Sequence, residues 1–168
     1  MRFTVAGHYD VGVDDFWSKV FFETDFNDYL YGPSGLDFPK YEILEEDTQP
    51  GGRRTRVLKA FPKVAAPGPL KKVFGAELNY LETGEMDVER RAWMTKIWIP
   101  SVGQKIRLSG DMSFQATSPH TCVRKMVFDL EVKIFGVGRL AERFVKSALQ
   151  ENYERARVVT NQWIAENL

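Results

Sequence analysis

The sequence predicts a single α+β domain, residues 1–168, in which a curved antiparallel sheet of about seven strands surrounds one long C-terminal helix. Three observations predict this architecture. The length of 168 residues suits one ordinary domain. Residues 105–117 and 122–135 alternate apolar and polar side chains, as antiparallel strands with one buried and one wet face do. Residues 137–168 repeat apolar side chains at helical spacing.

The N-terminal part predicts a strand followed by two short helices. Residues 2–9, RFTVAGHY, carry apolar side chains at period two and favour a strand. Asp14 or Asp15 can cap a first short helix. Thr24 to Tyr31 can form a second one, which the turn sequence GPSG at residues 32–35 ends.

The middle of the chain predicts further strands separated by turns. Residues 62–77 contain three prolines, which exclude a central strand and favour a loop with one helical turn at LKKVF. Residues 77–100 favour two strands with a break near Thr83 to Val88. The other expected elements are a hairpin of residues 41–48 and 53–61 joined by QPGG at 49–52, and a turn at 118–121 between the two alternating strands.

The C-terminal helix is the strongest single element, because no glycine or proline interrupts it after Gly138. At 1.5 Å per residue it is about 40–45 Å long. We expect it to run from about Val137 to Glu166 and to pack the face of Leu140, Phe144 and Ala148 on the apolar face of the sheet.

Composition narrows the class of function. Lys plus Arg and Asp plus Glu are 23 each, and a nucleic-acid binder would usually show a basic excess, so we expect no nucleic-acid partner. Two histidines, His8 and His120, are too few for an ordinary metal site, and we predict no metal and no cofactor. The N-terminus has no secretory signal core and no window is apolar enough to cross a membrane, so we expect a cytoplasmic protein.

Two small groups of residues have both a catalytic and a structural interpretation. His8 beside Asp10 can do acid–base chemistry, but the pair also fits the exposed end of a strand. Cys122 can be a nucleophile, but no activating group is visible, and a small apolar residue in a strand explains it. We therefore predict no catalytic residue from the sequence.

Two further patterns concern anion recognition. Arg53, Arg54 and Arg56 favour a solvated strand face, yet they can grip a carboxylate or phosphate if one of them points into a cavity mouth. Gly136 and Gly138 lack the third glycine of a dinucleotide fingerprint and indicate a sharp joint between strand and helix.

The two ends of the chain resemble the START-like superfamily, also called the helix-grip fold. The resemblance rests on FTVAGHYDVGVDDFWSKVFF at residues 3–22 and DLEVKIFGVGRLAERFVKSAL at 129–149. The tail also resembles a bacterial START-like family of uncharacterised function, through Val132, Lys133, Ile134, Gly136, Gly138 and Glu142. The resemblance implies an internal cavity between helix and sheet, which in relatives holds lipids, sterols, plant hormones or polyketides. Some members are cyclases, so the fold leaves the activity open.

The function expected is binding or transfer of an apolar small molecule in that cavity. Two alternatives stay open: a cyclase- or hydrolase-like enzyme using the same cavity, for which no inward polar cluster is visible, and a partner-binding domain without a ligand. Residues 32–35 and 62–74 are candidate gates, and Lys71 with Lys72 leaves open a transient membrane contact. The sequence predicts no particular oligomeric state.

The ligand-binding residues expected are the apolar side chains of three strands and the last helix. Trp93 and Trp98 lie on opposite faces of one strand, and Lys96 beside Trp98 favours Trp93 as the inward one. The complete set is Trp93, Ile106, Leu108, Met112, Phe114, Met126, Phe128, Leu140, Phe144 and Ala148.

Overall fold

The computed structural model describes all 168 residues, and its seven strands form one antiparallel sheet in the order β1-β7-β6-β5-β4-β3-β2. Consecutive strands are neighbours except β1 and β2, which lie at opposite edges. The chain must therefore cross the sheet between them, and short helices make this crossing. The strands are β1 (Arg2–Tyr9), β2 (Lys40–Thr48), β3 (Arg54–Phe61), β4 (Tyr80–Asp87), β5 (Ala92–Trp98), β6 (Ile106–Ser118) and β7 (Thr121–Val132).

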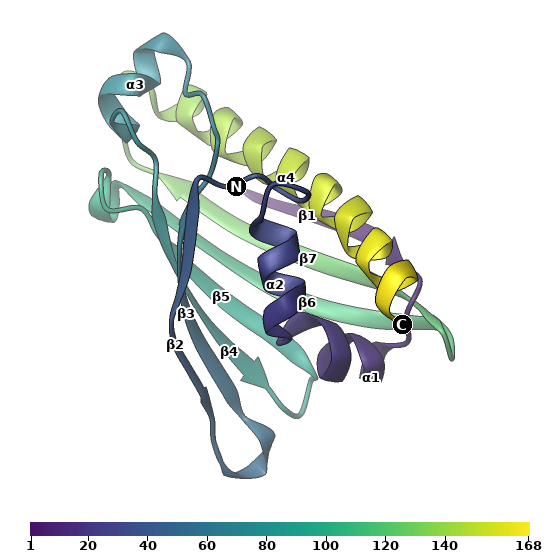
Figure 1. Cartoon of the computed structure of the whole chain (residues 1–168). Helices are drawn as coiled ribbons and strands as arrows, with labels where there is room; N and C mark the ends of the chain where they lie inside the picture. Colours follow the sequence, from purple (N-terminus) through teal and green to yellow (C-terminus); the bar gives the residue numbers. More distant parts are fainter.

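The helices lie on one face of this curved sheet. Figure 1 shows α4 running diagonally across that face, with α2 beside it and α3 near the first turns of α4. The crossing between β1 and β2 consists of α1 (Val13–Phe16), the π-helix η1 (Trp17–Phe21) and α2 (Thr24–Tyr31). The remaining helices are α3 (Gly68–Phe74), α4 (Gly138–Asn167) and the 3₁₀ turns η2 (Pro50–Gly52) and η3 (Gly103–Lys105). None of the helices is both long and apolar enough to cross a membrane.

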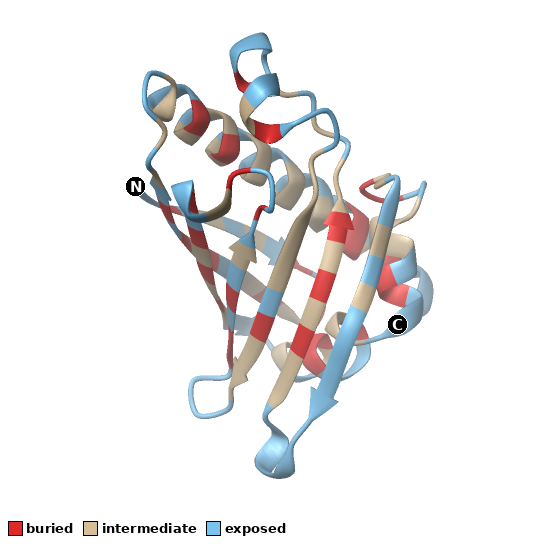
Figure 2. Ribbon diagram, turned by 90° about the vertical axis from the view of Figure 1, so that its left-hand side faces the viewer, coloured by how far each residue is buried: buried red, intermediate tan, exposed pale blue.

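The inner face of the sheet is the apolar one, as the alternation predicted. In β6, Ile106, Leu108, Gly110 and Met112 are buried, and the residues that alternate with them are more exposed. Figure 2 shows the same alternation of buried and accessible positions along the central strands. Trp93 is 1% exposed and Trp98 is 40% exposed. The prediction that Trp93 faces inward is confirmed.

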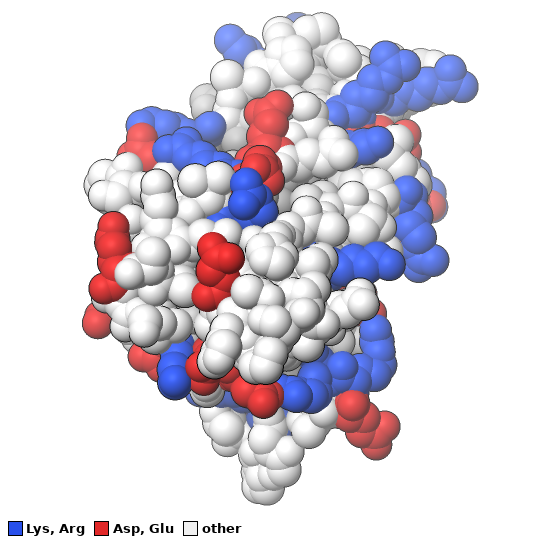
Figure 3. All heavy atoms as spheres, turned by 90° about the vertical axis from the view of Figure 1, so that its right-hand side faces the viewer, with Lys and Arg blue, Asp and Glu red and all other residues white.

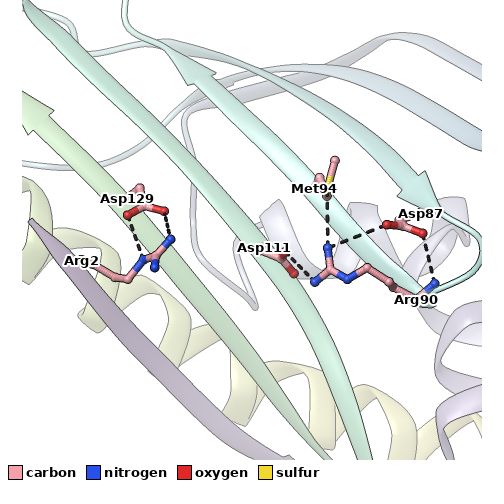
Figure 4. A network of polar contacts seen from close by, with 6 residues as sticks. All are labelled: Arg2, Asp87, Arg90, Met94, Asp111 and Asp129. Carbon is pink, nitrogen blue, oxygen red and sulfur yellow. Dashed lines mark hydrogen bonds and ion pairs between the residues drawn. The ribbon is translucent and has the colours of Figure 1, made fainter.

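The outer face of the sheet is polar. Arg2 on β1 forms two hydrogen bonds with Asp129 on β7, and Arg90 contacts Asp111 on β6 at 2.7 Å (Figure 4). Exposed pairs of this kind contribute at most about 1 kcal/mol each. Their main effect is to keep this face hydrated. On the side of the molecule seen in Figure 3, charges of both signs are present, and Lys and Arg gather along one edge.

The edge strand β2 differs from the rest of the sheet. It is exposed along most of its length and reaches, with β3, into a long hairpin whose tip is also exposed (Figure 2). Its pairing with β3 shifts by one residue between Ile43 and Glu45, which marks a bulge.

The face of α4 that packs on the sheet is rotated from the expected one. Ala141 and Val145 are buried, whereas Leu140 is 38% exposed, so the expectation that Leu140 faces the sheet is wrong. Adjacent residues in a helix point about 100° apart, and the helix starts at Gly138 in an orientation that turns Ala141 inward. Phe144 is half-buried and packs against Phe74 of α3, with ring centroids 5.3 Å apart.

Two element boundaries also differ from the sequence prediction. The break between β4 and β5 lies at 88–91, not at 83–88, so Thr83 is inside β4. β7 ends at Val132, and Phe135 projects fully into solvent next to Gly136, whose φ of +80° turns the chain toward α4. The alternation that continues to residue 135 in the sequence therefore does not reflect pairing.

Candidate functional site

An internal cavity of about 100 Å³ lies between α2, the C-terminal half of α4 and the inner face of strands β3 to β7. Its apolar wall comes mainly from aromatic and methionine side chains. These apolar residues are Phe16, Phe21, Phe26, Leu30, Leu36, Trp93, Met112, Met126 and Ala156. Polar side chains reach the same cavity: Asn27, Tyr31, Arg56, Tyr80, Glu82, Thr95, Arg124, Asn152, Tyr153 and Thr160.

Arg56 is the most deeply buried charged residue of the cavity, at 5% exposure. Alternation along β3 turns it inward together with Leu58 and Ala60. Its guanidinium donates one hydrogen bond, to the Phe21 carbonyl at 3.4 Å, and lies 4.6 Å from the Phe21 ring and 5.6 Å from the Trp93 ring. It forms no ion pair with any carboxylate of the chain.

Glu82 faces the cavity from the neighbouring strand. In the β3–β4 register Arg56 pairs with Gly84 and Glu82 pairs with Leu58, so Arg56 and Glu82 are diagonal neighbours on the inner face. Burial raises the pKa of the Glu82 carboxyl, and the positive charge of Arg56 opposes this to a smaller extent. Part of its side chain remains accessible, and this residue lines the cavity. The neutral acid is therefore favoured over a wider pH range than for an ordinary glutamate.

Three tyrosines add hydroxyl groups to the cavity wall. Tyr31 comes from α2, Tyr80 from β4 and Tyr153 from α4, and burial raises the pKa of all three phenols. Their hydroxyls make no hydrogen bond within the chain and stay protonated, so each can donate to a bound molecule. The ring of Tyr31 is held by Tyr41 of β2, with centroids 4.7 Å apart.

A second guanidinium, that of the half-buried Arg124, lies on the opposite side of the cavity floor from β3. It stacks over the rings of Tyr9 and Tyr153, at 4.7 and 5.0 Å, and it too forms no ion pair. Together with Arg56, two permanently charged groups line the cavity, while Glu82 is its one carboxyl. Hydrogen-bond donors therefore outnumber negatively charged acceptors.

Trp93 forms the floor of the cavity because a glycine makes room for it. A Cβ on Gly84 would overlap the six-membered part of the Trp93 indole. The indole Nε1–H and the Thr95 hydroxyl are buried without a hydrogen-bond partner. Buried polar atoms without partners are uncommon in folded proteins, and two of the four such side-chain atoms in this chain belong to residues of the cavity wall.

The residues expected from the sequence to bind a ligand divide into three groups. Trp93, Met112 and Met126 line the cavity. Ile106, Leu108 and Phe128 are buried in the surrounding core, and Phe114 packs against Phe16 with ring centroids 4.5 Å apart. Leu140, Phe144 and Ala148 belong to the N-terminal half of α4 and do not line it.

Of the three arginines considered from the sequence as ligands for a carboxylate or phosphate, Arg56 lines the cavity and Arg53 and Arg54 do not. The other residues considered lie outside it. His8 and Asp10 are exposed, with Nε2 and Oδ1 3.9 Å apart. Cys122 is buried, and burial raises the pKa of its thiol to about 11. Arg53 pairs with Glu85 on the surface at 2.6 Å. Of the two candidate gates, GPSG leads directly into Leu36 of the cavity wall, whereas no residue of 62–74 lines it.

Glu82 and the tyrosines of the polar cluster were missed from the sequence, where the inner faces of the strands were expected to be mostly apolar. Arg56 was considered, but only as one of three arginines that could reach a cavity mouth. A signal was present in β3, since Arg56 lies at period two with the buried Leu58 and Ala60. The contribution of Tyr31 and Tyr153 could not be found in this way, because it depends on how α2 and α4 lie over the sheet.

This sheet with its long gripped helix has the helix-grip fold, which is also called the START-like fold. The chain belongs to the family described as "Protein of unknown function (DUF2505)", whose model matches residues 4–164. No protein with a curated description matches it.

Solved structures share the fold at low sequence identity. The chain is similar to the ZhuI aromatase/cyclase from Streptomyces sp. R1128, with a TM-score of 0.66 and 14% identity over 96% of this chain and 92% of the other. It is also similar to a START superfamily protein from Mycobacterium smegmatis, with a TM-score of 0.61 and 14% identity over 96% and 98%. Norcoclaurine synthase from Thalictrum flavum, in complex with dopamine and hydroxybenzaldehyde, gives a TM-score of 0.66 and 16% identity over 100% and 88%.

Proposed function

We propose that this protein binds or transfers an apolar small molecule, of lipid, sterol or polyketide type, in the cavity between α4, α2 and the sheet. One observation carries the proposal: an apolar-walled cavity encloses a buried guanidinium, that of Arg56, which has no charged partner in the chain. A buried charge without a charged partner lowers the stability of the fold. Its presence therefore favours a ligand-binding cavity over a core that is only packed.

The walls suit an apolar occupant. Burial of apolar surface contributes roughly 25 cal/mol per Å². Met112 and Met126 lie side by side on the floor, paired across β6 and β7, and methionine side chains adapt to the shape of a ligand. The hydroxyls and guanidinium groups on the remaining wall would orient the molecule.

The size of the cavity limits what it holds without movement. At about 100 Å³ it is smaller than the roughly 300–1,000 Å³ of pockets for drug-sized ligands, and nearer to the cavity of about 150 Å³ that admits benzene. It therefore accommodates about one ring or a short chain. A longer molecule requires α2 and residues 32–36 to move outward.

α2 is attached in a way that permits this movement. It is held by aromatic contacts, Phe26 with Trp163 at 5.3 Å and Tyr31 with Tyr41 at 4.7 Å, and by the hydrogen bond of Tyr41 to Asp28. Unlike the strands, it is not hydrogen-bonded into the sheet. Segments with few such constraints open at lower free-energy cost than paired strands do.

The proposal is tested by mass spectrometry of small molecules extracted from protein purified without denaturant. We expect a co-purified apolar compound from the wild type and its loss from Ala156→Leu, which fills the cavity from α4. Ala148→Leu is the matched control, since it adds the same atoms to the same helix away from the cavity. If neither an extracted compound nor any response to added apolar compounds is found, the partner-binding domain without a ligand becomes the better account.

A second candidate function, an enzyme of the cyclase or hydrolase kind, is favoured by Glu82. A carboxyl whose pKa is raised by burial keeps its proton to a higher pH than an ordinary glutamate, and it can therefore donate that proton as a general acid. The exposed His8 and Asp10 cannot serve this cavity. Comparison of the compounds extracted from the wild type and from Glu82→Gln separates the two functions. An enzyme should accumulate a precursor of different mass in the variant, whereas a binding protein should yield the same compound.

A further inference from the structure

The charge balance of the cavity indicates the chemical class of its ligand. We infer that the ligand is an apolar carboxylic acid, bound as the carboxylate by the guanidinium of Arg56. This inference rests on the proposed function and adds to it the group by which the molecule is recognised. Three features of the cavity residues support it.

The first feature is that Arg56 has unused donors. A guanidinium carries five N–H groups and is charged at every relevant pH. The rings of Phe21 and Trp93 cover its faces, and the carbonyl of Phe21 takes one N–H. The remaining N–H groups have no acceptor in the chain. These N–H groups keep some contact with solvent, since the fully buried side-chain atoms without a partner are those of Tyr9, Trp17, Trp93 and Thr95. They are therefore free to bind an acceptor from outside the chain.

The second feature is that the chain does not supply this acceptor itself. Glu82, the one carboxyl of the cavity, is a diagonal neighbour of Arg56 but makes neither an ion pair nor a hydrogen bond with it. Burial favours its neutral form, which donates a hydrogen bond instead of accepting charge. Tyr31, Tyr80 and Tyr153 offer three further hydroxyl donors. All these groups suit a bound carboxylate, which has two oxygens and no donor.

The third feature concerns the positive charge of the two arginines in the cavity wall. Arg124 is half-buried and stacked over Tyr9 and Tyr153, so Arg56, at 5% exposure, is the more deeply buried of the two guanidinium groups. The single negative charge of a carboxylate balances the charge of Arg56. The planar fork of arginine also matches the two carboxylate oxygens.

The test compares two single-ring probes that differ only in the acidic group, 4-ethylbenzoate and 4-ethylbenzyl alcohol. Their dissociation constants are measured at pH 7 by NMR titration of the labelled protein, which reads weak binding. The wild type should bind the acid at least about tenfold more tightly, as expected for a hydrogen bond to a charged group. Arg56→Gln should reduce this preference to about twofold or less and leave the affinity for the alcohol nearly unchanged.

The control is Arg53→Gln, which removes the same charge from an exposed arginine beside β3, paired with Glu85. It should keep the full preference for the acid. Arg56→Lys, which keeps the charge but loses the planar fork, should give an intermediate preference. If Arg56→Gln does not fold, Arg56→Lys and Arg124→Gln decide the question: a preference that is full in Arg56→Lys and lost in Arg124→Gln overturns the assignment to Arg56.

Three results would overturn the inference. Equal affinity of the wild type for acid and alcohol would contradict recognition of a carboxylate but would still support the proposed binding function. Failure of both probes to bind would contradict both the binding function and the inference. A preference that survives Arg56→Gln but disappears in Arg124→Gln shows that the other guanidinium holds the acid.

Discussion

The indole of Trp93 lies against the backbone of Gly84, so closely that glycine is the one residue that fits at position 84 without moving the ring. The two residues are diagonal neighbours on β4 and β5, since Trp93 pairs with Met86 and Gly84 with Thr95. This contact sets the floor of the cavity, because it fixes the height at which the indole lies above the sheet.

Gly84→Ala should destabilise the fold by about 1–3 kcal/mol, the usual cost of inserting atoms into a filled core. It should also shift the emission of Trp93, because the ring must move. Urea denaturation and fluorescence measure both effects. Gly110→Ala is the control: its Cβ meets the end of the flexible Met126 side chain and lies 3.0 Å from the Thr95 Oγ1, so a smaller loss is expected. Equal losses would show that the indole is not the constraint.

Glu82 should make stability depend on pH. The native carboxyl keeps its proton above the ordinary pKa of 4.5, at which the unfolded chain loses it. The native state then binds more protons than the unfolded state, so the free energy of unfolding falls as pH rises from about 4.5 through the raised pKa. Glu82→Gln should flatten this fall, measured by denaturation between pH 4 and 9. Glu85→Gln, on the same strand but on the surface with Arg53, should leave it in place.

Phe144→Ala should cost roughly 2–3 kcal/mol, somewhat less than the ~3–5 kcal/mol of a fully buried phenylalanine. Phe144 is half-buried and holds α3 through Phe74, away from the cavity. Binding of an apolar probe should therefore be unaffected. Leu140→Ala, in the same helix but exposed, should change stability by no more than about 0.5 kcal/mol. A large loss of probe binding in Phe144→Ala would mean that the ligand also occupies this end of α4.

Single-tryptophan variants should separate the two faces of β5. With only Trp93 retained, an apolar probe that enters the cavity should change the emission in a saturable way, because this residue lines the cavity. With only Trp98 retained, the emission should change little, since this side chain is on the outer side. A response from Trp98 alone would place the binding site on the outer face.

The thiol of Cys122 should be inert in the native protein. It is fully buried, and burial raises its pKa to about 11, so almost none of it is the reactive thiolate at pH 8. A colorimetric disulfide reagent should therefore react only at the rate of unfolding, and quickly in 8 M urea. Rapid reaction without denaturant would show that β7 opens locally.

The fold could be predicted from the sequence because its strands and its last helix have regular patterns. From Ile106 to Phe114 on β6, every inner position except Gly110 carries a large apolar side chain. The burial along the strand follows this alternation. The period-two rule and the helical repeat depend on local geometry alone. For the same reason they placed α2 at Thr24–Tyr31, as the structure has it.

The candidate site could be predicted less well from the sequence than the fold, and β4 shows the physical reason. Glu82 and Gly84 occupy inner positions of that strand, so its inner face does not look apolar, and the sequence suggested a break at Thr83 instead. The features that made the strand hard to recognise are those that build the cavity: a buried carboxyl and a glycine under an indole. The rotation of α4, which exposes Leu140, depends on tertiary packing and has no local signal.

The exposed edge strand β2 has a consequence for how copies of the protein meet. A free edge presents unpaired N–H and C=O groups and can recruit the same strand of another molecule into a continuous sheet. In β2 the bulge at Ile43–Glu45 breaks the regular spacing of those groups. Its acidic side chains are Glu42, Glu45, Glu46 and Asp47. Two such strands brought together would set carboxylates against carboxylates, so at neutral pH charge repulsion opposes pairing of this edge with the same edge of another copy.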